Sequence, residues 1–222
     1  MVTLEERAVR RLALVRAGLL AAKRAGFPCG CGRGEAQGRR AALQVIERFG
    51  YLQLDTVSVA GARTHGIVLL SRLQGFDPAL AEALLAPGEP LFEYWGHEAS
   101  WIPLSLYPLF RWRREQFRRH PWWGDILNQH RALAKEVLRR VEGEGPLTSR
   151  QLGNGAQRPR GGFWQLSAIK RVLAALWSSG ELAIHQRSNF QRCYDLVERV
   201  IPEELRERHV SDEDAFAALL LK

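Results

Sequence analysis

The sequence lacks the features of a membrane or exported protein. No uninterrupted apolar segment approaches the length that spans a bilayer. The N-terminus, MVTLEERAVRRL, has charges where a signal peptide needs an apolar core, so we expect a cytoplasmic protein. With 222 residues, 46% of them hydrophobic and 25% charged, the chain is expected to fold as a soluble globular protein of one or two domains.

Cysteine is scarce, with three residues in the chain. Cys29 and Cys31 form a C-x-C and Cys193 lies far downstream, which is neither a disulfide framework nor a zinc spacing. The C-x-C belongs to FPCGCGRGEAQGRR, which lacks the G-K-[ST] ending of a P-loop and has no strand pattern before it. This segment is predicted to be a glycine-rich surface loop.

The charge is unbalanced, with a formal net charge of +8 and a pI near 10.0. This excess favours a polyanionic partner, although a basic pI also occurs in many proteins that bind no nucleic acid.

The hydrophobic pattern predicts helices separated by short strands, without internal repeats. Thr3 and Glu6 have the spacing of a capping box, which predicts a first helix running to about Ala22. Asp77 followed by Pro78 marks another helix start.

The segment FGYLQLDTVSV carries two polar residues inside an apolar run. It follows a helical pattern that Gly50 is expected to end, so a strand is predicted next. Side chains on a strand alternate, which places Gln53 and Asp55 on one face and Leu52 and Leu54 on the opposite, core-facing side. The polar pair is either the solvated face of an edge strand or a functional patch.

The segment SLYPLFRWRREQFRRH, from Ser105 to His120, interleaves aromatic residues with arginines. One interpretation is a helix that grips phosphates, since arginine pairs bidentately with phosphate oxygens. The other is an amphipathic helix that buries Trp112 and Phe117 while its arginines stay solvated. The sequence does not decide between them.

The second half has the order of a winged helix-turn-helix. Thr148 and Gln151 form a capping box, a helix is predicted from Trp164 to Ser179, and Gly180 ends it. Two alternating runs joined at Ser188-Asn189 then predict a hairpin. In this fold the later helix approaches the duplex and the wing touches the DNA backbone, although winged helices also dock proteins. The basic residues expected to contact DNA are Lys170 and Arg171 on the helix, Arg158 and Arg160 in the preceding turn, and Arg187 and Arg192 near the wing tip.

Several segments together resemble a known family. They are RRLAL, GYLQLDTVSV, GARTHGIVLLSRL, LFEYWGHEAS and NFQRCYDLVERVIP. In these segments the chain resembles the AlkZ/YcaQ-type DNA glycosylases. The resemblance implies a mainly α fold with small β-hairpins and tandem winged-helix domains. The helix-helix-hairpin pattern of the second half and the helix-then-strand pattern around Gly50 divide the chain into a first winged-helix-like domain at 1–142 and a second at 145–200. An exit segment at 201–222 begins a C-terminal domain.

The resemblance also implies an active site. In the family, the strand motif of glutamine, an apolar residue and then glutamine or aspartate is held to be catalytic. The matching residues here are Gln53 and Asp55, as in the aspartate-bearing, YcaQ-like branch. The family is associated with excision of bulky alkylated bases and with unhooking of interstrand crosslinks. The implied partner is double-stranded DNA, at the nucleoid, and we expect a monomer.

The residue types suit base excision. Alkylation at N7 of guanine or N3 of adenine makes the base a cationic leaving group, so the transition state has oxocarbenium character. A carboxylate such as Asp55 can stabilise that cation or deprotonate water, while Gln53 can orient the water. No lysine adjoins the pair to form a Schiff base. We therefore expect a monofunctional glycosylase, and no metal or cofactor.

Other polar residues are weaker candidates. His97-Glu98 begins like the zinc motif H-E-x-x-H, but Trp101 replaces the second histidine and excludes it. His97 either approaches the lesion or satisfies a buried hydrogen bond, with the buried alternative preferred. The residues Arg63, His65 and Arg72 are assigned to DNA or substrate contact.

Family members are usually longer, and this chain stops as a helix capped by Ser211 begins. We therefore expect a C-terminally truncated chain. The alternative function is a non-catalytic winged-helix DNA-binding protein, such as a transcriptional regulator, in which Gln53 and Asp55 are only surface residues.

Overall fold

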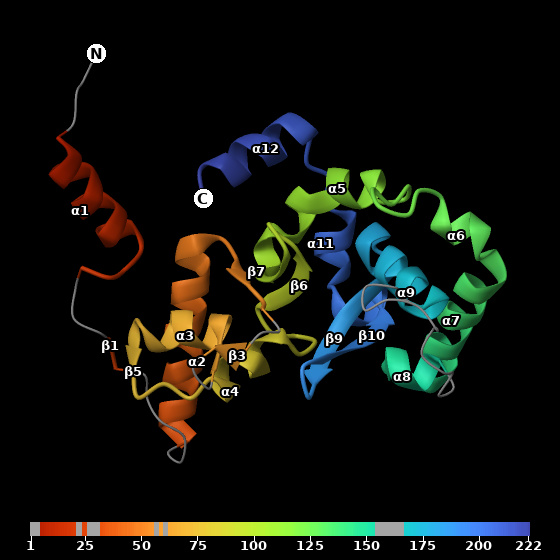
Figure 1. Ribbon diagram of the computed structural model, residues 1–222, viewed down its shortest axis with the longest axis horizontal. Coiled ribbons are helices and arrows are strands. Elements are labelled where there is room, and N and C mark those ends of the chain that lie inside the picture. The colour runs from red at the N-terminus through yellow and green to blue at the C-terminus, as the bar shows by residue number, and fades with distance from the viewer. Residues whose placement is uncertain (1–4, 21–23, 26–31, 56–57, 60–61, 154–166) are drawn as a thin grey trace. The chain divides into compact units, whose positions relative to one another are not determined.

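The computed structural model describes residues 5–20, 24–25, 32–55, 58–59, 62–153 and 167–222, and this part of the chain is mainly helical with small sheets (Figure 1). It divides into two compact units. Unit 1 comprises residues 1–84, 96–103 and 222, and unit 2 comprises residues 85–95 and 104–221. The domain boundary expected between residues 142 and 145 falls inside unit 2. No helix in the described ranges is both long and apolar enough to cross a membrane.

Unit 1 is built around one long helix. Its elements are α1 (Glu6–Arg16), β1 (Arg24–Ala25), α2 (Gly32–Phe49), β2 (Leu52–Gln53), β3 (Ser58–Val59), β4 (Ala62–Arg63), α3 (Thr64–Leu70), β5 (Leu73–Gln74), α4 (Ala79–Glu82) and β7 (Ala99–Pro103). The buried face of α2 includes Ala42, Val45 and Ile46, and α2 packs against α4 and β7. The strands pair as β2 with β7 and β3 with β4, both antiparallel, and as β1 with β5, which are parallel.

Unit 2 contains the remaining elements, and the short 3-10 helix η1 (Ala83–Leu85) leads into it. They are β6 (Leu91–Trp95), the 3-10 helix η2 (Leu104–Phe110), α5 (Arg111–Gln116), α6 (Ile126–Gln129), α7 (Arg131–Glu144), β8 (Leu147–Thr148), α8 (Ser149–Leu152), α9 (Ala168–Ser179), β9 (Leu182–Ser188), β10 (Gln191–Leu196), α10 (Val197–Val200), α11 (Glu203–Glu207) and α12 (Asp212–Leu220).

The elements from α7 to β10 pack around one core. β8, β10 and β9 form an antiparallel sheet in that order, and α7 and α9 pack against each other beside it (Figure 1). Val141, Val172 and Leu173 are fully buried between these elements. The predicted capping box is confirmed, because Thr148 Oγ1 accepts a hydrogen bond from the N–H of Gln151 while the Gln151 side chain accepts from the N–H of Thr148.

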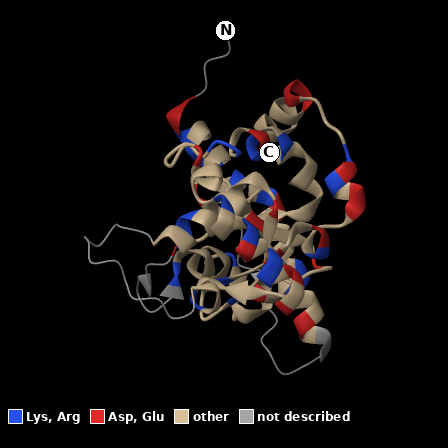
Figure 2. Ribbon diagram, turned by 90° about the vertical axis from the view of Figure 1, so that its right-hand side faces the viewer, with Lys and Arg blue, Asp and Glu red and all other residues tan. Residues whose placement is uncertain are grey.

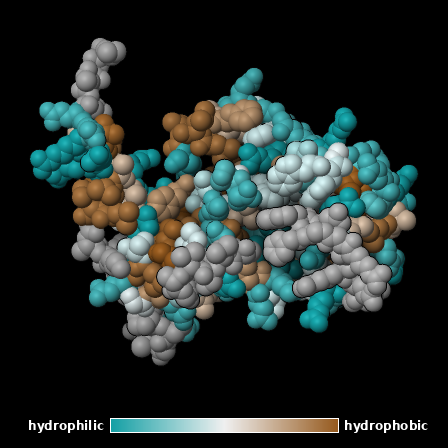
Figure 3. Space-filling view, in the orientation of Figure 1, coloured by the Kyte–Doolittle hydropathy of each residue, from teal (hydrophilic) through white to brown (hydrophobic). Residues whose placement is uncertain are grey.

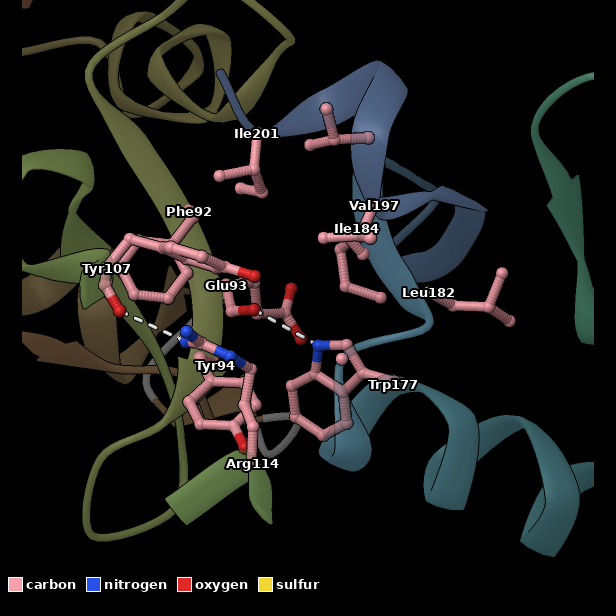
Figure 4. Close-up of a pocket in the computed structure, with 13 residues that line it drawn as sticks. Phe92, Glu93, Tyr94, Tyr107, Arg114, Trp177, Leu182, Ile184, Val197 and Ile201 are labelled. Carbon is pink, nitrogen blue, oxygen red and sulfur yellow. Dashed lines mark hydrogen bonds between the residues drawn. The ribbon is translucent and has the colours of Figure 1, made fainter. Parts of the chain in front are cut away.

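β6 brings aromatic residues into the core of unit 2. The Tyr94 hydroxyl donates to the carbonyl of Ser178, and Trp177 Nε1 donates to the carbonyl of Glu93 at 3.1 Å. Tyr94 and Trp177 meet edge to face, and Figure 4 shows both rings beside this strand. Two hydrogen bonds and a ring contact thus fix β6 to the C-terminal turn of α9.

The glycine-rich segment was predicted wrongly in its second part. Cys29 and Cys31 lie outside the described residues, but the chain is helical from Gly32 onward. Glycines weaken a helix locally, yet the apolar stripe of the following residues anchors it through packing, which outweighs propensity.

The first helix is shorter than predicted, and its capping residue Thr3 lies outside the described residues. It ends at Arg16, and none of its residues is buried. Figure 3 shows brown, hydrophobic side chains on this helix and on α12. The exposed apolar residues of the two helices are Val9, Leu12, Leu14 and Val15 on α1 and Phe216 and Leu220 on α12.

Other boundaries were predicted well. Gly50 and Gly180 end α2 and α9 with positive φ angles of 75° and 90°. Asp77 accepts a hydrogen bond from the N–H of Ala79 at the start of α4, and Ser211 caps α12.

Two local predictions differ from the structure. The hairpin is confirmed, but its turn is Asn189-Phe190 rather than Ser188-Asn189, since both residues have positive φ. The segment from Ser105 to His120 is split into a 3-10 helix, η2, and α5. Pro108 lies inside η2, where its missing N–H disfavours a regular α-helix.

Candidate active site

The predicted polar pair lies at the end of a short strand in unit 1. Leu52 and Gln53 form β2, paired with Trp101 and Ser100 of β7, and Leu54 N donates to the carbonyl of Ala99 at 2.8 Å. Within the described residues, this bond extends the pairing one residue beyond β2. The strand is shorter than the sequence pattern, and Asp55 lies just after it.

Burial alternates along this segment as predicted. Leu52 and Leu54 are 4% and 7% exposed, whereas Gln53 and Asp55 are half-buried and Tyr51 is exposed. The amide and the carboxylate therefore share the face that reaches solvent, while the leucines contact the core. This places one hydrogen-bonding group and one carboxylate close together at a protein surface.

The turn before β7 lies against the same face. Residues directly opposite on paired strands point to the same side, so Ser100 shares the face of Gln53. A Cβ atom at Gly96 would lie 2.8 Å from Ser100 Oγ and 3.1 Å from a ring carbon of Tyr51. Only glycine fits this approach without displacing a neighbour. The Gly96 N–H and Ser100 Oγ both donate to the carbonyl of Glu98, which closes the turn.

Sequence reasoning missed Tyr51, Gly96 and Ser100 as residues around the site. Tyr51 could have been found, because it precedes Gln53 by two positions and so shares its face. Gly96 and Ser100 come from a distant segment, and no local pattern indicates that they pair with β2.

His65 lies on the opposite side of the sheet from the polar pair. It is 3% exposed, and its ring meets the ring of Trp101 at 5.0 Å, edge to face. Trp101 is paired with Leu52, so both belong to the core side. This geometry favours a packing role for His65 over the predicted contact with DNA.

The two predicted arginines of unit 1 differ in their surroundings. Arg63 is half-buried at the start of α3. Arg72 donates from Nε to the carbonyl of Ala17 at 2.8 Å and stacks over the ring of Phe49 at 5.0 Å. Burial, followed by the charge of Arg48, lowers the pKa of Arg72. Arg72 thus ties the end of α3 to two other segments of the unit.

His97 is exposed in the turn that precedes β7. The preferred interpretation, a buried histidine with a satisfied hydrogen bond, was therefore wrong. The side chain is accessible, and its contact with DNA stays a prediction.

The predicted DNA contacts in unit 2 fall into three groups. Arg158 and Arg160 lie outside the described residues. On α9, Lys170 is exposed and Arg171 is half-buried, and Arg171 Nε is buried without a hydrogen-bond partner in the described part of the chain. Figure 2 shows lysine and arginine residues on several helices, interspersed with acidic residues.

The third group, Arg187 and Arg192, binds an internal carboxylate. Both contact Glu93, whose side chain is fully buried, with N–O distances of 2.6–2.7 Å. Arg192 also lies 4.1 Å from the ring centre of Trp177. This geometry favours a structural role for both arginines over the predicted contact with DNA at the wing tip, since both guanidinium groups bind Glu93. Glu93 lies almost a hundred residues away, so the sequence pattern gave no sign of the pairing.

Comparison with known proteins gives an independent result. A protein-family model described as DNA glycosylase AlkZ-like matches residues 46–222, about four fifths of the chain. The matched range includes Gln53, Asp55 and the whole of β7. No solved structure matches the chain significantly.

Proposed function

The chain belongs to the DNA glycosylase AlkZ-like family, and we propose that it hydrolyses the N-glycosidic bond of alkylated bases in double-stranded DNA, with Gln53 and Asp55 as the catalytic residues. The observation that carries this proposal is the alternation of burial from Leu52 to Asp55. It gives the amide and the carboxylate a common face that reaches solvent.

The proposed chemistry uses the positive charge of the damaged base. An adduct at N7 of guanine or N3 of adenine leaves with the electron pair of the bond to C1′, and positive charge develops on the sugar. Asp55 stabilises that charge, or accepts the proton of the water that attacks C1′. Gln53 orients this water through its amide. The products are the free base and an abasic site, as expected of a monofunctional enzyme.

The open location of the pair favours bulky substrates. Many glycosylases extrude the damaged base into a closed pocket, which excludes an adduct that is joined to the opposite strand. Gln53 and Asp55 lie instead at a partly exposed strand end, bordered by Tyr51 and the turn at Gly96. We therefore include bulky alkyl adducts and interstrand crosslinks among the substrates.

We further propose that the elements from α7 to β10 form a winged-helix module that binds DNA. The order of helix, strand, two helices and two strands, with the sheet order β8-β10-β9, supports this assignment. In such a module α9 approaches the duplex, and Lys170 is exposed on it. A tandem arrangement, with a second such unit in the first part of the chain, is part of the same proposal.

The test is release of the base from a duplex that contains one N7-alkylguanine, followed by alkaline cleavage of the abasic site. Asp55→Asn should lower the excision rate by about two to four orders of magnitude, the range for loss of a general base or a preorganised charge. Gln53→Ala should act in the same direction but more weakly, because other groups can partly hold the water. DNA binding should change little in either variant.

Glu47→Gln provides a matched control, since it neutralises an exposed carboxylate in the same unit. It should retain the wild-type rate. Full activity in the double variant of Gln53 and Asp55 would refute the site. Binding to DNA without any base release by the wild type would instead support the alternative, a non-catalytic DNA-binding protein.

A further inference from the structure

Unit 2 contains a cavity of about 230 Å³ whose polar lining is mostly arginine. It lies where α5, the C-terminal end of α9 and α11 meet, so all of its residues belong to one compact unit. The charged residues that line it are Arg111, Arg114, Arg118, Arg206 and Glu115.

The charge of this cavity is strongly positive. Arg111, Arg114 and Arg118 follow at intervals of three and four residues, which places them on one face of α5 and the turn after it. Arg206 adds a fourth cation from α11, and Glu115 is the single carboxylate of the lining. The carboxyl end of α9 contributes about half a negative charge, which does not offset an excess of three positive charges.

One guanidinium group of the cavity is held in place before any ligand binds. Arg114 Nη1 donates to the carbonyl of Tyr107 at 3.0 Å, and its Cζ lies 3.9 Å from the centre of the Tyr107 ring (Figure 4). A Cβ atom at Gly180 would lie 2.7 Å from Arg114 Cδ, so the glycine leaves room for the arginine stem. Burial, and then the charge of Arg111, lowers the pKa of Arg114, although nearby tyrosines oppose this shift. A bound anion would relieve both of these costs.

The other arginines retain donors for a ligand. Arg206 donates from Nε to the carbonyl of Ile201, and its Nη1 lies 3.7 Å from Glu207 Oε1 in a partly exposed ion pair. Arg111 donates from Nε to Glu115 in an exposed pair. Arg118 is exposed and makes no side-chain hydrogen bond within the ranges that the structure describes. A guanidinium group has five N–H donors in a planar fork, so donors remain on each of them.

We propose that this cavity binds a phosphate group. Arginine forks match the oxygens of phosphate, and several of them converge here on one small space. The cavity is open to solvent, so a phosphate group can enter it while the rest of the molecule that carries the group stays outside. The phosphate comes from the DNA backbone or from a free phosphorylated molecule. The backbone is the preferred source, and this preference alone rests on the proposed function.

The first experiment tests whether the protein binds free inorganic phosphate. The melting temperature of the protein is followed with increasing inorganic phosphate, against sodium chloride at equal ionic strength. A ligand that binds only the folded state raises the melting temperature in a concentration-dependent manner. We expect this rise in the wild type and its loss in the double variant Arg111→Gln/Arg118→Gln.

The second experiment measures the affinity of the protein for undamaged duplex DNA, so that its result does not depend on base excision. Loss of a charge-assisted contact to one phosphate should weaken binding by about tenfold or more, since such contacts contribute roughly 1.5–3 kcal/mol. The slope of log K against log salt should become less steep by about 0.9 for one phosphate. Arg139→Gln is the matched control. Like Arg111→Gln it removes an exposed helical ion pair, but Arg139 does not line the cavity.

The outcomes separate the sources of the phosphate. Loss of both effects in the double variant, with Arg139→Gln unchanged, supports a backbone phosphate. Loss of the effect of free phosphate alone supports a free phosphorylated ligand, and loss of duplex binding alone supports a contact that needs the rest of the DNA. The proposal is overturned if the double variant behaves as the wild type in both assays, or if Arg139→Gln weakens binding equally.

Discussion

Glu93 shows how one residue can organise a unit from inside. Its carboxylate is fully buried and binds Arg187 of β9 and Arg192 of β10. Burial alone would raise the pKa of Glu93, but the charges and hydrogen bonds of Arg192 and Arg187 together outweigh it and hold the pKa below its ordinary value. The carboxylate is therefore charged at neutral pH, and it joins β6 to the hairpin.

Glu93→Gln should destabilise the protein by about 3 kcal/mol or more, because it leaves the two largely buried cations of Arg187 and Arg192 without their shared carboxylate. The free energy of unfolding in urea measures this effect. Glu136→Gln serves as the control, since it removes a carboxylate from an exposed pair with Arg139. The control should change stability little, because exposed ion pairs contribute little, and an equal loss in both variants would contradict the assigned role.

The same residue predicts a dependence on pH. A carboxyl group whose pKa is lowered by folding contributes stability above its unfolded pKa, about 4.3. This contribution is lost as the pH falls through the lower pKa of the folded state. The difference in unfolding free energy between wild type and Glu93→Gln should therefore be full at pH 7 and shrink below about pH 4. A difference that stays constant down to pH 3 would show that the charge of Glu93 is not responsible.

At the scale of single elements, glycines mark where helices end. Gly180 follows α9 with φ 90° and faces Arg114, whereas Gly143 lies within α7 with open space around it. A side chain is therefore expected to be unfavourable at Gly180 and favourable at Gly143.

Gly180→Ala should destabilise the protein by about 1–2 kcal/mol from backbone strain alone, with a further cost for displacing Arg114. Gly143→Ala should instead stabilise it by about 0.5–1 kcal/mol, because alanine favours the helix. Thermal unfolding of the two variants gives both values. A stabilised Gly180→Ala protein would show that the end of α9 adapts to a left-handed alanine more easily than its geometry indicates.

Local patterns predicted the elements that depend on local chemistry. The capping box at Thr148, the helix ends at Gly50 and Gly180 and the alternation around Gln53 all follow from residues within one turn or strand. The start of α2 at Gly32 could not be predicted from local residues, because packing of α2 against the rest of unit 1 overrides the weak helix propensity of glycine.

Features that depend on distant residues could not be predicted in the same way. The pairing of Arg187 with Glu93 and of Ser100 with Gln53 joins segments that are far apart in the chain. The cavity at Arg114 likewise combines η2, α5, α9, α10 and α11. From the sequence alone, a charged residue of the hairpin that faces solvent could not be distinguished from one that faces the interior.

For the whole molecule, the dominant quantity is the excess of positive charge. A formal charge of +8 favours association with a polyanion before any specific contact forms. Not every cation is available for such a contact, since the guanidinium groups of Arg187 and Arg192 both bind the buried carboxylate of Glu93 inside unit 2.

Binding to undamaged duplex DNA should weaken steeply with salt, by about 0.9 log units per log unit of salt for each phosphate neutralised. Fluorescence anisotropy of a labelled duplex, from 50 to about 200 mM salt, measures the slope. Because both side chains bind the buried Glu93 instead of facing a ligand, replacing Arg187 or Arg192 should leave this slope unchanged in protein that remains folded, whereas Lys170→Gln should reduce it. Affinity that is independent of salt would contradict phosphate contact altogether.

The separation of Glu93 from its partners also bears on the order in which the molecule folds. The residue precedes Arg187 by 94 positions and Arg192 by 99. In the sequence, residues 96–103 of unit 1 separate β6 from the rest of unit 2. Contacts of such long range form late, because the entropy lost on closing a long loop is offset only once the contacts have formed. On the ribosome, β6 must therefore wait until the hairpin has been synthesised. During this interval Glu93 keeps its hydration, and the aromatic core that surrounds it stays open.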